Sequence, residues 1–359
     1  MLSKVLKSTF FTRWGTALFF VLGFLFDLLT LDRVDDSFTL WQQFLYIIFL
    51  LWALNFDWLH KDRSEKFANK AVDLYWKYRL LLQHFVFGSL LSAYAIFYFA
   101  SAHSWQIFFF MGIIVFLLFA NEFSFFQKLG LVFRSVLLSL CTLCFLFYAV
   151  PVLLGELNHL CFYVSLLFSF TVFYVLYRRS KDSLTQKDLF TKMYLWPVVF
   201  VHVFVLLLYV AKLIPPVPLS VHHAGIYHKV EKKNALYTLS YLRPWWKFWQ
   251  KKSEPFVASK GDRLYYFASV FSPNGFKQVL KIQWYHKENN KWRKWDEVPI
   301  QSVGGRKRGF RGYVYKQNYT AGEWKLELRS SSGHLLERRY FKVSNASTLE
   351  PTKFRQISL

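Results

Sequence analysis

Cysteine is scarce in this sequence and absent from its second half. The 359 residues contain three cysteines, Cys141, Cys144 and Cys161, each within an apolar run. The C-terminal region therefore has no disulfide bonds and needs an apolar core of its own. Cys141 and Cys144 have the spacing of a redox motif, but apolar surroundings disfavour the reactive thiolate. We interpret them as two small buried residues on one helix face.

Acidic residues are also few, with 22 Asp and Glu against 45 Lys and Arg, which gives a net charge of +23. The surplus is uneven, because the residues from Val221 onward carry 27 basic and 10 acidic side chains, a net charge of +17. A basic domain attracts anionic partners such as lipid headgroups, acidic glycans, nucleic acid or acidic proteins.

Long polar stretches are rare before residue 215, where apolar runs of about 20 residues recur. Runs of this length can cross a bilayer as helices, so residues 1–214 are predicted to form an α-helical membrane bundle. No small-residue cleavage site follows the first run, which we interpret as a retained span. Seven spans are predicted, at residues 14–31, 38–56, 80–101, 105–120, 132–154, 160–177 and 193–214.

The distribution of Lys and Arg between these spans predicts their orientation. Connections on one side carry 16 basic residues, whereas the opposite connections carry Arg33 alone. Short basic connections remain in the cytoplasm, so the N-terminus is predicted to be cytoplasmic and the C-terminal region periplasmic. The sequence thus suggests a multi-pass protein of a bacterial inner membrane.

Residues 215–254 are predicted to be an exit linker followed by a segment at the membrane interface. Pro215 and Pro216 stiffen the exit from the bilayer. Aromatic rings and ammonium groups suit contact with anionic lipid headgroups better than nucleic acid, which is not an expected partner outside the membrane. The interfacial residues are Trp245, Trp246, Lys247, Trp249, Lys251 and Lys252.

Residues 255–344 change to a period of two, typical of strands. Strands are predicted at residues 264–271, 279–286, 291–300, 310–315, 324–328 and 335–343. Several short strands at this spacing indicate an all-β, immunoglobulin-like sandwich. Residues 345–359 are predicted to be a disordered tail.

Within this region, the pattern GFR from Gly309, GEW from Gly322, Gly333 and FKV from Phe341 resembles a bacterial C-terminal domain of unknown function. The resemblance covers roughly residues 265–343. It implies a β-sandwich in the bacterial envelope and brings no catalytic residues.

The same region carries the candidate ligand site. Arginine can bind an acidic group in a bidentate manner, and tryptophan can stack on a sugar ring or a cation. The candidate residues are Trp292, Trp295, Arg306, Arg308 and Arg311. The expected ligand is an acidic glycan, a lipid headgroup or a partner protein.

The sequence contains no clear sign of an enzyme. Neither a Ser-His-Asp order nor metal-ligand spacing is visible, so no catalytic residue, metal or cofactor is predicted. His222, His223 and His228 could bind a metal, but no cysteine or acid pair accompanies them.

A different function is suggested by polar residues inside the predicted spans. Asp27 lies in the first span and His202 in the last. Ionisable residues at such positions often serve a transporter or a membrane sensor, which is the alternative function. The structural alternative is that Asp27 is hydrated near the interface and His202 bonds a neighbouring helix.

Overall fold

The structure is a computed structural model, and it forms two compact units that are described separately. It describes residues 25, 27, 31, 34–60, 67–102, 105–123, 129–181, 187–234, 236–243, 246–247, 249–259, 261–305, 309–345 and 354–359. The first unit comprises Met1–Ala100, Trp105–Leu154 and His159–Val217, and the second comprises Ser101–Ser104, Gly155–Asn158 and Pro218–Leu359.

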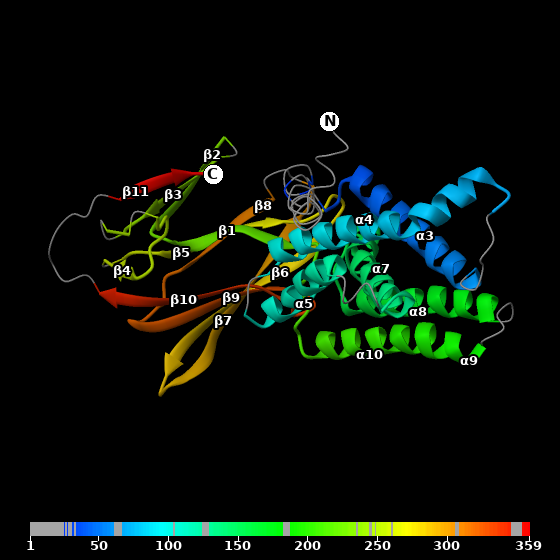
Figure 1. Ribbon diagram of the computed structural model, residues 1–359. Coiled ribbons are helices and arrows are strands. Elements are labelled where there is room, and N and C mark those ends of the chain that lie inside the picture. Colours follow the sequence, from blue (N-terminus) through cyan, green and yellow to red (C-terminus); the bar gives the residue numbers. More distant parts are fainter. Residues whose placement is uncertain are drawn as a thin grey trace. The chain divides into compact units, whose positions relative to one another are not determined.

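The first unit is helical (Figure 1). Its elements are α3 (Ser37–Leu59), α4 (Lys70–Ala100), α5 (Trp105–Glu122), α7 (Leu131–Leu154), α8 (His159–Lys181), α9 (Lys187–Phe190), the π-helix η1 (Thr191–Leu195) and α10 (Trp196–Val210). Asp36 caps α3, since its Oδ2 accepts a hydrogen bond from the Thr39 N–H at 3.0 Å. Pro197 follows the π-helical turn within the first positions of α10.

Five helical stretches in the described residues are long and apolar enough to cross a membrane. They are Ser37–Leu59, Lys70–Ala100, Leu131–Leu154, His159–Lys181 and Lys187–Val210. The predicted count of seven spans is not supported. The predicted first span, residues 14–31, lies almost wholly outside the described residues, and the predicted fourth span corresponds to a shorter apolar helix, Ile107–Asn121.

Helix α7 lies at the centre of the first unit. An apolar stretch of 18 residues in α7 is 78% buried, whereas the corresponding stretches of α3, α8 and Lys187–Val210 are each 33% buried. The exposed parts of those helices still carry large apolar side chains, among them Phe38, Trp41, Leu167 and Phe200. Apolar surface of this extent is unusual on a water-soluble protein and fits a membrane protein.

The described residues of the second unit form three sheets. The first has the order β1-β5-β8, formed by Ser220–Tyr227, Leu264–Phe271 and Phe310–Lys316. The second has the order β4-β10-β9-β6-β7, formed by Phe256–Ala258, Leu335–Asn345, Gly322–Ser330, Lys277–Glu288 and Lys291–Val303. The third has the order β11-β3-β2, formed by Arg355–Ser358, Leu236–Tyr241 and Lys229–Lys233.

Side chains from the first two sheets share one apolar core. Trp284 and Trp324 of the five-stranded sheet are almost fully buried with Tyr266 and Ile226 of the other sheet. The third sheet has a smaller core, where Tyr237 and Leu239 pack with Phe267. Alternate residues of each long strand supply these cores, as a period of two requires.

Each of the six predicted strands is present, as β5 to β10. The structure adds strands where the sequence predicted none. Residues 215–254, expected to be an exit linker and an interfacial segment, contain β1, β2 and β3, and the expected disordered tail ends in β11. Backbone pairing explains these additions, because β1 pairs with β5 and β11 pairs with β3 although both strands have weak apolar alternation.

Candidate functional site

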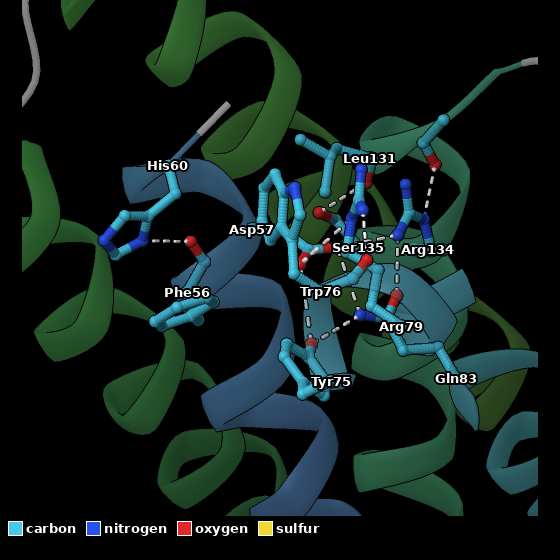
Figure 2. A network of polar contacts seen from close by, with 11 residues as sticks. Phe56, Asp57, His60, Tyr75, Trp76, Arg79, Gln83, Leu131, Arg134 and Ser135 are labelled. Carbon is cyan, nitrogen blue, oxygen red and sulfur yellow. Dashed lines mark hydrogen bonds and ion pairs between the residues drawn. The ribbon is translucent and has the colours of Figure 1, made fainter. Parts of the chain in front are cut away.

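A buried carboxylate links three helices of the first unit (Figure 2). Asp57 of α3 is 4% exposed. Its Oδ2 lies 2.9 Å from Nη1 of Arg134 in α7 and accepts a hydrogen bond from Nε2 of Gln83 in α4 at 3.1 Å. Arg134 also donates to Oε1 of Gln83 at 2.6 Å. The three side chains therefore form a closed polar triangle.

Two further residues of α4 complete this network. The Tyr75 hydroxyl donates to Oδ1 of Asp57 at 3.4 Å and accepts from Gln83 at 3.1 Å. Arg79 Nε lies 3.8 Å from Oδ1 of Asp57, and its guanidinium lies 3.7 Å from the ring centroid of Trp76. Figure 2 shows these side chains pointing toward the carboxylate from α4 and α7. An apolar environment favours such pairing, because an isolated buried charge is costly.

The sequence prediction does not include this network. It ends the second span at Phe56, one residue before Asp57, and it gives no intramembrane role to Arg134, which lies within the predicted span 132–154. A signal was nevertheless present, since Asp57 is the only charged residue in the 23 residues of α3.

The two predicted intramembrane residues have separate surroundings. His202 is buried in α10, where its Nδ1 donates to the Val198 carbonyl at 2.9 Å and its Nε2 accepts from the Ser169 hydroxyl of α8 at 3.1 Å. Asp27 is half-buried in a helical position. Among the described residues, no hydrogen bond or ion pair joins Asp27 to His202. The contacts of His202 are those of a residue that holds two helices together.

In the second unit, the two predicted ligand-binding tryptophans lie on opposite faces of the five-stranded sheet. Trp295 is the additional residue of a β-bulge between Lys294 and Asp296, and its ring centroid lies 5.4 Å from that of the buried Trp324. Trp292 pairs with Lys287 and points to the other face. One ligand therefore cannot contact both rings from one side of the sheet.

The predicted arginines are only partly described. Arg306 and Arg308 lie outside the described residues. Arg311 belongs to β8 in a different sheet, with its guanidinium 5.5 Å from the ring centroid of Tyr237. Arg311 and Trp292 therefore belong to different sheets and do not share a sheet face.

The predicted interfacial segment is partly described, and Trp245 lies outside the described residues. Trp246 and Trp249 are 53% and 63% exposed. Lys247 lies over the Trp246 ring at 4.8 Å, and Arg243 donates to the backbone carbonyls of Lys247 and Gln250. Lys251 is exposed, whereas Lys252 is half-buried and lies 3.2 Å from Glu254.

The face of the five-stranded sheet that carries Trp292 concentrates basic and aromatic side chains. We call it the basic face. By strand register it presents Lys277, Lys281, Lys287, Lys294, Lys325, Arg329, Arg338 and Lys342, with the acids Glu297, Glu323 and Glu327 and the rings of Tyr285, Trp292 and Tyr340. Eight cations against three acids leave a positive surplus.

The centre of the basic face is a lysine surrounded by rings. The Lys325 ammonium lies 3.9 Å from the ring centroid of Tyr285 and 5.6 Å from that of Trp292. The rings of Trp292 and Tyr340 approach to 5.6 Å, although their strands are separated by two others. Side chains from both sides thus converge over the middle strands.

Glu327 organises the cations beneath these rings. Its carboxylate lies 3.1 Å from Lys325, 2.6 Å from Arg329 and 2.9 Å from Arg338. Burial opposes its ionisation, but hydrogen bonds from Arg329 and Lys325 hold the pKa of Glu327 below its ordinary value. One carboxylate orders three cations, so most of their charge remains available to an anionic ligand.

The described residues contain no group of three His, Cys, Asp or Glu side chains placed to hold a metal ion. His228, one of three histidines considered for a metal, instead lies 3.3 Å from Asp262 and stacks on Phe256.

Comparison with known proteins adds a family relationship for part of the chain. Residues 277–343, from β6 to β10, match a family described as "Protein of unknown function (DUF2914)". No curated protein matches the sequence. A solved structure, Pseudomonas fluorescens alkylpurine DNA glycosylase AlkC bound to DNA containing an abasic site analog, is similar at 12% identity and a TM-score of 0.22. The match covers 79% of this chain and 84% of that one. The C-terminal region thus contains a domain of unknown function.

Proposed function

We propose that this chain is a membrane-anchored binding protein whose basic face holds an acidic glycan outside the cytoplasm. The observation that carries the proposal is the arrangement of Trp292, Tyr340 and Lys325. Rings provide flat apolar surfaces for sugar rings, and neighbouring ammonium and guanidinium groups can pair with sugar carboxylates or phosphates.

The shape of the surface favours a glycan over a small ion. Tyr340, Lys325, Tyr285 and Lys294 are register partners on four adjacent strands, so rings and cations alternate across the sheet. Such a row suits an extended chain with repeated acidic groups. Tyr340 is 57% exposed and therefore accessible to it.

The predicted location supports this ligand class. The asymmetry of Lys and Arg between the apolar runs favours a periplasmic second unit on a bacterial inner membrane. The exposed ring of Trp246, with Lys247 beside it, would contact anionic lipid headgroups.

A binding experiment on the full-length protein tests the proposal. The protein is placed in phosphatidylcholine nanodiscs and titrated with tetragalacturonate, a carboxylated oligosaccharide, at physiological salt. Cellotetraose serves as the neutral control. We expect Trp292→Ala to weaken tetragalacturonate binding about tenfold, because loss of a ring contact costs about 1–1.5 kcal/mol.

Trp295→Ala is the matched control, since it removes the same residue type from the same strand but from the opposite face. Equal losses in the two variants would refute a site on the basic face. Capture of anionic phosphatidylglycerol vesicles without any binding of tetragalacturonate would assign the face to lipid and overturn the glycan proposal. Tight capture of an acidic protein alone would overturn it as well.

Orientation is tested separately with reporter fusions. Alkaline phosphatase, which is active only outside the cytoplasm, is fused after Leu359, and the matched fusion is made after Lys181. We expect activity only in the first. The opposite pattern would place the second unit in the cytoplasm and remove periplasmic glycans as its ligands.

A further inference from the structure

A pocket of about 540 Å³ lies within the second unit and shares Arg338 with the basic face. Its walls come from β1, from residues 249–252 and from the first half of β10. The lining side chains include His222, Trp249, Lys251, Lys252 and Arg339. A volume of this size is within the range of small-molecule sites and exceeds the need of a single bound ion.

The wall formed by residues 249–252 is fixed to β1 by backbone contacts. The buried Ser253 donates its N–H to the Ile226 carbonyl at 2.8 Å, and its hydroxyl accepts the Leu242 N–H at 3.0 Å. Gly225 allows the close approach, because a Cβ there would lie 3.1 Å from Cβ of Lys252. The pocket is therefore held open by the fold before any ligand arrives.

Cations converge on this pocket from two directions. Arg339 comes from β10, and Lys251 and Lys252 come from the segment attached to β1. Lys252 Nζ lies 3.2 Å from Glu254, and Arg339 Nε lies 2.7 Å from Glu337. Among the described residues, Lys251 makes no ion pair. Its ammonium group is free to bind an anion.

The two carboxyl groups beside these cations are unusual. Burial raises the pKa of Glu254 to about 8, and burial together with the nearby Glu254 raises the pKa of Glu337 to about 8. Burial thus favours the protonated form of both groups, although Lys252 and Arg339 lie within ion-pair distance of them. The charges of Lys252 and Arg339 are then not fully compensated by the protein.

The remaining ionisable groups around the pocket do not cancel this surplus. Burial lowers the pKa of His222, and burial with the charges of Arg339 and Lys251 lowers the pKa of His223, so both rings are neutral at pH 7. Burial raises the pKa of Tyr227 and of Tyr266, which keeps both hydroxyls neutral. Arg338, the last charged residue of the lining, directs its guanidinium to Glu327 on the basic face at 2.9 Å and is not counted in this surplus.

We propose that this pocket binds a phosphorylated sugar, with the phosphate held by Lys251, Lys252 and Arg339 and the sugar ring against Trp249. Three cations on two walls match the several oxygens of a phosphate monoester. The exposed Trp249 ring offers an apolar face next to them. This site is distinct from the proposed glycan site, because the residues that hold its phosphate, Lys251, Lys252 and Arg339, do not belong to the basic face.

Isothermal titration of the full-length protein in phosphatidylcholine nanodiscs tests the inference. Glucose 6-phosphate is the probe and glucose the neutral control, both at physiological salt. We expect Lys251→Gln to weaken glucose 6-phosphate binding about tenfold, since it removes a charge-assisted hydrogen bond to the phosphate. Trp249→Ala should weaken it about fivefold.

Lys247→Gln is the matched control, because Lys247 belongs to the same segment and lies over Trp246 instead of lining the pocket. Arg339→Gln should abolish binding, but it also removes the ion pair of 2.7 Å with the buried Glu337. Lys251→Gln therefore decides the result. Absence of glucose 6-phosphate binding at about 1 mM, or equal losses in Lys251→Gln and Lys247→Gln, would overturn the proposal.

The pair of buried acids, Glu254 and Glu337, allows a second test, which is the pH dependence of binding. Glucose 6-sulfate keeps a constant charge between pH 7 and pH 9, so a change in its affinity reports on the protein. We expect its affinity to fall about fivefold over this range as Glu254 and Glu337 ionise, and Glu337→Gln to remove most of that fall. An affinity independent of pH in the unchanged protein would refute the role of the pair.

The phosphate could be presented by a soluble sugar or by a lipid headgroup. Repeating the titration in nanodiscs that contain phosphatidic acid distinguishes the two sources. Competition with glucose 6-phosphate supports the site and shows that a membrane phosphate reaches it. If phosphatidic acid does not change the affinity for glucose 6-phosphate, the site binds a soluble phosphorylated sugar.

Discussion

Trp292 and Trp295, three positions apart on β7, lie on opposite faces of the five-stranded sheet, as the alternation of a strand predicts. A β-bulge at Trp295 adds one residue between Lys294 and Asp296. The bulge directs Trp295 to Trp324 and His286, at centroid distances of 5.4 Å and 5.6 Å. Trp292 therefore lies on the basic face, and Trp295 lies on the face that packs on the core.

The first prediction concerns the stability of the second unit. Trp295→Ala should lower its free energy of unfolding by about 1–2 kcal/mol, because the ring packs on the buried Trp324 and is itself only 40% exposed. Trp292→Ala should have a smaller effect. Hydrogen exchange of the β9 amides in the full-length protein measures both. A larger loss of protection in Trp292→Ala would contradict the assignment of faces.

The second prediction concerns the buried network of the first unit. Arg134→Gln should destabilise the helices by about 3 kcal/mol, because it leaves the Asp57 carboxylate buried without its closest cation. The double variant Asp57→Asn and Arg134→Gln should recover most of the loss. Thermal unfolding in detergent measures the difference. If the double variant is no more stable than the single one, the pairing does not stabilise the bundle.

The third prediction is a dependence of stability on pH. The pKa of Glu337 is raised to about 8 in the folded state, so folding favours its protonated form. This contribution is fully present below the unfolded carboxyl pKa and is lost as pH rises through about 8. Glu337→Gln should therefore protect the β10 amides better than the unchanged protein at pH 9, with little difference at pH 5.

Glu323→Gln provides the control for that experiment. Glu323 is exposed, and the Lys287 ammonium at 2.6 Å lowers its carboxyl pKa. Its substitution should leave the profile between pH 6 and pH 9 unchanged. A profile that Glu337→Gln does not alter would show that the buried acid pair is ionised throughout.

The fourth prediction concerns the C-terminal strand. Removing residues 354–359 should expose the β3 amides to exchange, because β11 pairs with β3 and Leu359 exchanges two backbone hydrogen bonds with Tyr237. Ile357 and Leu359 also cover the core of the third sheet. Unchanged exchange in β3 would show that this strand pairing does not persist in solution.

The main organisation of the chain could be predicted from its sequence. Apolar runs and their basic connections indicate helices for a membrane, and alternation in segments such as 264–271 and 335–343 indicates strands. Strands β2 and β11 could not be found in this way. Lys229–Lys233 contains a single apolar residue, and Arg355–Ser358 has four residues, so their strand conformation depends on pairing with β3.

The candidate sites divide in the same way. Local sequence identifies Trp292 and the interfacial residues, since residue type alone marks them as candidates for binding. It cannot place Asp57 next to Arg134, 77 positions away, or Glu254 beside Glu337. A buried ionic contact exists only when packing brings two distant segments together and removes water from both. Composition and periodicity thus determined what each segment can become, and tertiary packing decided which charges meet.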